Sequence, residues 1–168
     1  LYAVFSIGLI AAFATPLAYR HDVASMEHRD FFTHTMIWAG GLAPSLLALW
    51  VVATVWRAKK SYQPGRRALW SALIASLVLF IYGGLLGAMI SGQNVVIPAH
   101  YHGSIVGITL AFMGVAYLLL PELGYRDPAG WRLAFWQPIV YAIGQVMHIS
   151  GLAYSGGYGV LRKTPGEV

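Results

Sequence analysis

Residues 68–90 read ALWSALIASLVLFIYGGLLGAMI, an apolar stretch without a single charged side chain. Its length is close to the roughly 20 residues that an α-helix needs to cross the hydrocarbon core of a bilayer. A helix is also the default spanning structure, because it satisfies all of its backbone hydrogen bonds within one segment. This stretch therefore predicts a transmembrane helix.

Four further apolar segments flank this stretch, at residues 1–19, 35–56, 95–120 and 133–154. The composition also indicates an integral membrane protein. Hydrophobic residues make up 58% of the chain and charged residues only 10%, whereas ordinary globular chains have roughly 25% charged residues. The mean hydropathy is +0.62. We predict an all-α, polytopic membrane helix bundle of about five transmembrane helices, forming one helical domain over residues 1–168. Because the sequence starts inside an apolar run, we expect the later part of a longer or split subunit.

Basic residues gather in two of the predicted loops. The loops that follow the second and fourth segments carry Arg57, Lys59, Lys60, Arg66, Arg67, Arg126 and Arg132. The positive-inside rule places these loops in the cytoplasm. The C-terminal tail with Arg162 and Lys163 then faces the outside, where this pair predicts an anionic partner. The net charge of +5 reflects this topology, and we expect no nucleic-acid partner.

Histidine is the main candidate for metal ligation, because the chain has no cysteine. The informative stretch is NVVIPAHYHGS, residues 94–104, in which Pro98 suits the first turn of a helix. His100 and His102 lie about 200° apart around that helix, so they cannot bind one metal ion together. They can bind two different centres on the order of 13 Å apart, a geometry that suits electron transfer between two haems. The alternative is a pair of interfacial histidines bonded to water.

The other histidines leave several interpretations open. His148 lies inside the fifth segment, where it can ligate a metal, bond to a cofactor or pair with a neighbouring helix. The first loop carries His21, His28 and His34 among the acidic residues Asp22, Glu27 and Asp30. Their spacing matches no specific metal motif, so a solvated loop is favoured there.

Glycines are concentrated in the third and fourth segments. They are Gly83, Gly84, Gly87, Gly103 and Gly107. Glycine lets another group approach the backbone closely, and helix–helix packing is the favoured interpretation in a membrane protein. A flat macrocycle packed against the backbone is the alternative.

The sequence Ala99-His100-Tyr101-His102 resembles the start of the tenth helix in subunit I of the haem–copper oxidase superfamily. By resemblance, His100 is the ligand of the high-spin haem, and His102 is a ligand of the low-spin haem. The sequence from His148 to Ala153, followed by Arg162 and Lys163, resembles the end of the eleventh helix. In the family the basic pair there contacts haem propionates, so the resemblance also places His148 in the vicinity of a haem.

The resemblance covers nearly the whole chain, as helices seven to eleven of twelve. It also includes residues 6–33 and the glycines of residues 83–87. It implies a haem-binding subunit of a respiratory oxidoreductase that reduces oxygen or nitric oxide, with two haems, in a bacterial or archaeal inner membrane. Other membrane subunits supply the missing helices, and cytochrome c or quinol is the implied electron donor.

The sequence departs from the family at the copper site. The family holds copper with a His pair at the end of helix seven, and Leu17 and Ala18 stand there in this chain. His21 follows about one turn later without a His neighbour, and the family's helix-eight lysine has no counterpart. One alternative is therefore an electron-transfer subunit that has haem and no copper centre. A second alternative is a membrane scaffold without a cofactor.

Overall fold

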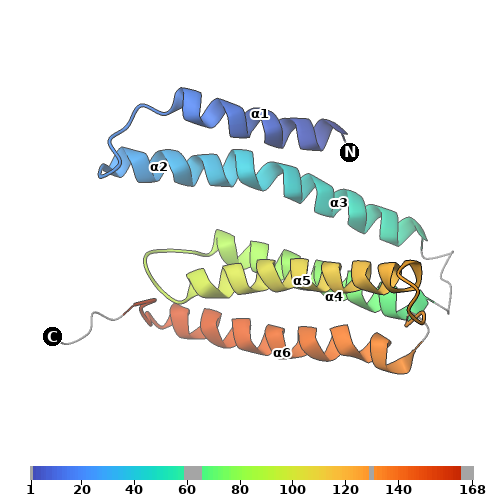
Figure 1. Ribbon diagram of the computed structural model, residues 1–168. Coiled ribbons are helices and arrows are strands. Elements are labelled where there is room, and N and C mark those ends of the chain that lie inside the picture. The colour runs from blue at the N-terminus through green and yellow to red at the C-terminus, as the bar shows by residue number, and fades with distance from the viewer. Residues whose placement is uncertain (1, 59–65, 129–130, 164–168) are drawn as a thin grey trace. The chain divides into compact units, whose positions relative to one another are not determined.

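A computed structural model of the protein describes residues 2–58, 66–128 and 131–163. Helices form its regular structure: α1 (Tyr2–Ala18), α2 (Met26–His34), the π-helix η1 (Thr35–Gly40), α3 (Gly41–Ala58), α4 (Arg67–Ala88), α5 (Val96–Glu122) and α6 (Arg132–Gly157) (Figure 1). The extended structure in the described ranges is one isolated antiparallel bridge. The predicted all-α class is confirmed. The chain divides into two compact units, Leu1–Ser61 and Tyr62–Val168.

In the first unit, α1 lies alongside a long helix that runs through α2, η1 and α3 (Figure 1). This long helix is π-helical from Thr35 to Gly40, and Pro44 follows within α3. Proline has no amide hydrogen, and its ring clashes with the carbonyl four residues earlier, which here belongs to Gly40. The π-helical turn therefore lies where Pro44 interrupts the regular hydrogen-bond pattern.

The polar stretch Met26–His34 is helical, so the predicted loop is wrong for His28 and His34. Ser25 caps this helix, because its hydroxyl oxygen accepts a hydrogen bond from the amide of His28 at 3.1 Å. Such a cap satisfies an amide that has no partner within the helix. The long helix therefore begins nine residues before the apolar segment that hydropathy predicts.

The second unit packs α4, α5 and α6 side by side, with α5 antiparallel to the other two (Figure 1). Its core consists mainly of small and aliphatic side chains: Ala75, Leu79, Leu86, Ala99, Val106, Leu110, Ala142 and Ile149. Glycines bring α4 and α5 together. A Cβ atom on Gly83 would lie 2.5 Å from the Ser104 nitrogen, and one on Gly107 would lie 2.8 Å from the Phe80 nitrogen. The predicted packing role is confirmed for these two glycines.

Three helices in the described ranges are long and apolar enough to cross a membrane. They are Met26–Arg57, α4 and α5. The helix α1 is a shorter apolar helix of 17 residues, and α6 has a lower hydropathy because it carries polar side chains such as Gln145 and His148. In the first unit no described residue is buried. Apolar surface of this extent marks contact with a membrane or with other protein.

Candidate functional site

The candidate site lies at the end of the second unit where α5 begins. The Asn94 side-chain oxygen accepts a hydrogen bond from the Val96 amide at 3.0 Å, in the first turn of the helix. The segment after α6 returns to this turn, because the Arg162 amide donates to the Gln93 carbonyl at 3.2 Å. A second bond joins the Val95 amide to the Val160 carbonyl at 3.0 Å. These bonds hold the basic tail beside the start of α5.

His100 faces α4. Its Nδ1 lies 2.7 Å from the carbonyl oxygen of Gly83. Because a carbonyl only accepts, Nδ1 carries the proton and Nε2 keeps its lone pair in the neutral ring. The imidazole lies against Gly87, where an added Cβ would be 2.6 Å from Nδ1. Gly83 therefore orients the ring of His100, and Gly87 leaves space for it.

His102 points toward α6. Its Nδ1 lies 2.8 Å from the carbonyl oxygen of Pro98, one turn earlier in the same helix, so its Nε2 also keeps the lone pair in the neutral ring. The ring stacks on Tyr101, with centroids 4.7 Å apart. It also meets the ring of His148 edge to face at 5.3 Å. The structure thus places His100 and His102 against two different helices.

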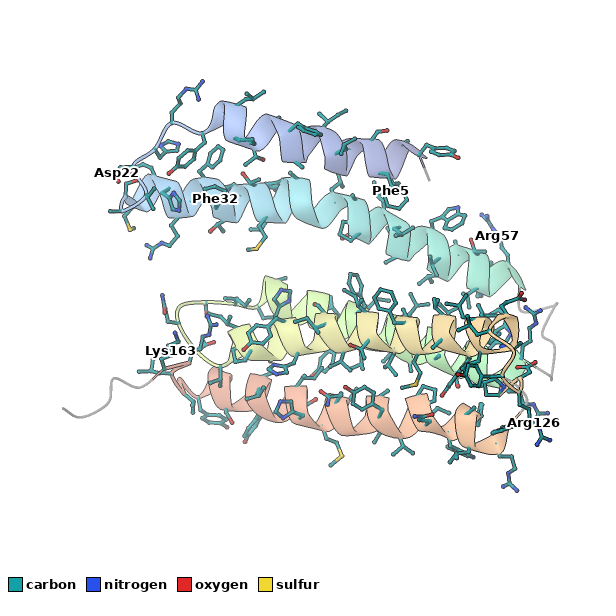
Figure 2. All side chains as sticks on the ribbon, in the orientation of Figure 1. Phe5, Asp22, Phe32, Arg57, Arg126 and Lys163 are labelled. Carbon is teal, nitrogen blue, oxygen red and sulfur yellow. The ribbon has the colours of Figure 1, made fainter. Side chains whose placement is uncertain are left out.

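Arg162 contacts the ring of Tyr101, which stacks on His102. Its guanidinium carbon lies 5.9 Å from the centroid of Tyr101, within the range of a cation–π contact. Lys163 is exposed at the same end of the unit, and Arg126 lies at the opposite end (Figure 2). Arg162, Tyr101, His102 and His148 form a connected set of contacts, which we call the His–Arg cluster.

Two features of the site have no counterpart among the sequence predictions. Tyr101 connects the histidine motif to Arg162, and its position between two histidines is the signal that sequence reasoning overlooked. Tyr82 and Ser150 share a hydrogen bond of 3.0 Å between α4 and α6. Polar bonds of this kind join helices inside membrane bundles.

Two histidines of the first unit, His21 and His28, belong to a separate aromatic cluster around Tyr19. The Tyr19 hydroxyl and His28 Nδ1 are hydrogen-bonded at 2.6 Å. The rings of His21, Phe31 and Phe32 contact Tyr19 as well. Over the whole described part of the chain, no group of three or more His, Asp or Glu side chains is arranged to hold a metal ion.

An apolar cavity with a volume of about 520 Å³ lies between α4 and α6 in the second unit. The lining of this cavity includes Arg67, Trp70, Val78 and Met147. It contains none of the histidines, so it is a feature separate from the His–Arg cluster.

Comparison with known proteins finds two similar sequences. The chain is 31% identical over 186 aligned residues to an uncharacterized protein of Rickettsia prowazekii, which covers 88% of this chain and 36% of that protein. It is 38% identical over 60 residues to an uncharacterized protein of Aquifex aeolicus, which covers 36% of this chain and 16% of that protein. No protein-family model and no solved structure matches. The chain thus spans about a third or less of the length of these two relatives.

Proposed function

We propose that this chain is a haem-binding integral membrane subunit of a respiratory redox complex, in which His100 and His102 would each ligate the iron of one haem. One observation carries the proposal. Both imidazoles stand on one helix and face different neighbours, and each bonds through Nδ1 to a backbone carbonyl. Each Nε2 is then the nitrogen with a lone pair, which is the atom an iron centre needs.

The membrane position rests on the apolar helices. Three helices are long and apolar enough to span, and we propose α1 and α6 as the remaining two of five spans. Large apolar side chains point outward, among them Phe13 at 68% and Leu133 at 77% exposure. Such exposure suits lipid or other membrane subunits far better than water. The proposed location is the inner membrane of a bacterium or an archaeon.

The nitrogen geometry of both histidines suits an iron ligand, and the surroundings of His102 also leave room for a haem. A hydrogen bond from Nδ1 to a carbonyl fixes the orientation of a ligating imidazole and makes Nε2 more basic. Beside His102, α6 exposes Gly144 and Gly151, where an added Cβ would meet nothing within 4 Å. This open strip around His148 suits a flat macrocycle. Arg162 and Lys163 offer charge-assisted hydrogen bonds to its propionates.

Haem at these positions supplies reversible one-electron chemistry, together with gas binding where a coordination position is open. The chain's own residues orient the two imidazoles and neutralise the propionates. By resemblance, His102 would hold the low-spin haem that receives electrons. His100 would hold the high-spin haem, where oxygen or nitric oxide is reduced. The proposed partners are the other membrane subunits and, as electron donor, cytochrome c or quinol.

A second candidate function is electron transfer by a haem subunit without a copper centre. The observation in its favour is that α1 ends in Leu17 and Ala18, where the resembled family has its copper-ligating histidines. Electron transfer needs both haem ligands and no second metal, so this candidate retains the same roles for His100 and His102.

The deciding experiment is a reduced-plus-CO minus reduced absorption spectrum of the intact complex in detergent. A CO-dependent shift indicates an open haem position and supports the gas reductase. A haem spectrum that does not respond to CO indicates six-coordinate haems and supports electron transfer. A complex without haem refutes both proposals and leaves the membrane scaffold.

Variants of the complex assign each haem signal. His102→Ala is expected to abolish the low-spin haem spectrum. His34→Ala is the matched control, because His34 is an exposed histidine outside the His–Arg cluster, and it should leave the spectrum unchanged. A low-spin signal that survives in His102→Ala would refute the ligand assignment.

A further inference from the structure

An apolar groove runs between α4 and α6 in the second unit. Its volume is about 520 Å³, within the range of pockets that hold small molecules. Small residues such as Ala75 and Ala142 are part of its lining, and larger aliphatic side chains such as Ile74 and Ile143 also line it. The groove is therefore suited to an apolar body that lies along the two helices.

Charge in this groove is confined to one end. Arg67 is the charged member of the described lining, and it belongs to the first turn of α4. The hydroxyl of Ser71, a polar group in the lining, donates to the Ala68 carbonyl at 2.9 Å, so its donor is satisfied within the helix. An occupant that matches the groove has one anionic end and a long apolar body.

The length of the groove matches one leaflet of a bilayer. It extends along α4 from Arg67 to Val78, about 16 Å at the helical rise of about 1.5 Å per residue. Half of a hydrocarbon core of about 30 Å is nearly the same length. Trp70 lies near the charged end, and tryptophan favours the membrane–water interface. The groove thus reaches from the cytoplasmic headgroup level to about the bilayer midplane.

We propose that the groove binds an acyl chain of an anionic phospholipid from the cytoplasmic leaflet, with the lipid phosphate at Arg67. The arginine fork suits a phosphate, because it donates two parallel hydrogen bonds. The site rests on the membrane position proposed above and is independent of haem. Charge complementarity favours the lipid over a helix of another subunit, because an apolar helix face offers no anion to Arg67.

The test measures lipid affinity with the intact complex in phosphatidylcholine nanodiscs. Spin-labelled phosphatidylglycerol is titrated in, and its immobilised fraction is measured by electron paramagnetic resonance. The removal of one cation near the membrane surface lowers the affinity for anionic lipid about fivefold, whichever residue carries it. Arg67→Gln also removes the proposed hydrogen bonds to the lipid phosphate, so it is expected to lower the affinity by well over fivefold. Arg66→Gln is the matched control, because it removes the neighbouring exposed cation, which does not line the groove, and it should lower the affinity by no more than about fivefold.

A second variant tests the apolar part of the groove. Val78 lines it and is 51% exposed, so Val78→Phe fills the groove without entering the core, and it should also weaken lipid immobilisation. Equal losses in the two arginine variants would overturn the proposal in favour of general surface charge. Equal immobilisation of spin-labelled phosphatidylcholine would overturn it as well.

The haem spectrum of the same samples separates this proposal from the proposed function. A complex that retains its haem spectrum but immobilises no phosphatidylglycerol refutes the lipid site alone and indicates that protein covers the groove. A complex that immobilises the lipid through Arg67 but contains no haem refutes the redox function and leaves the lipid site standing.

Discussion

Replacing Gly83 by alanine tests how closely α4 and α5 must approach. The added Cβ would lie 2.5 Å from the Ser104 nitrogen, 2.8 Å from the Gly103 carbonyl carbon and 2.9 Å from the His100 oxygen. All three are backbone atoms, which cannot rotate away, and favourable heavy-atom contacts are about 3.5 to 4.0 Å. The helices must therefore separate by about 1 Å at the crossing.

The magnitude follows from two opposing effects. Overpacking of a close-packed core costs about 1 to 3 kcal/mol, and a clash against three backbone atoms belongs at the upper end of that range. Alanine recovers about 1 kcal/mol of helix propensity relative to glycine. We expect Gly83→Ala to lower the free energy of unfolding by about 2 kcal/mol, the difference between these estimates.

The neighbouring glycine provides the matched control. A Cβ on Gly84 would meet nothing within 4 Å, so Gly84→Ala gains the propensity without the clash and should raise stability by up to about 1 kcal/mol. The assay is reversible unfolding of the detergent-solubilised complex, followed by circular dichroism. If the two variants have the same stability, the close crossing of α4 and α5 is refuted.

Three further substitutions test the site and its surroundings. Gly87→Ala places a Cβ 2.6 Å from Nδ1 of His100, so it should displace the imidazole and abolish the CO-sensitive haem signal with little loss of helix; an unchanged CO difference spectrum would contradict this. Arg162→Ala should lower the midpoint potential of the proposed haem in a redox titration, because it removes positive charge from the proposed propionate site, and an unchanged potential would give the residue a purely topological role. Ser25→Ala removes the cap on the His28 amide and should cost about 1 kcal/mol in unfolding experiments, and unaltered stability would show that the cap contributes nothing.

The helices of the second unit could be predicted closely from hydropathy. The apolar segment at residues 68–90 corresponds to α4, Arg67–Ala88, and the segment at residues 95–120 corresponds to α5, Val96–Glu122. The start of the long helix at Met26 could not be predicted in this way, because six of its first nine residues are polar. The available signal was local: Ser25 stands at the cap position, and the acidic residue Glu27 lies in the first turn, where it favours a helix.

Only the part of the candidate site that lies within one helix, α5, could be predicted from the sequence. A separation of two residues places His100 and His102 on different faces, and the structure sets them against α4 and α6. Their partners depend on tertiary pairing. Gly83 lies 17 residues before His100, and Arg162 reaches Tyr101 from the tail after α6. No periodicity within α5 encodes these contacts.

Helix packing and the orientation of the His100 ring are coupled in this protein through Gly83 and Gly87, which lie one turn apart. Because Gly83 has no side chain, α5 approaches α4 closely there, and the carbonyl oxygen of Gly83 lies 2.7 Å from Nδ1 of His100. Gly87 then leaves the space that the same imidazole occupies. A wider crossing would stretch this hydrogen bond and release the ring, and a side chain at Gly87 would push the ring away. The direction of the His100 Nε2 lone pair is therefore a property of the α4–α5 crossing, so substitutions that change this crossing should also change the binding of the haem proposed at His100.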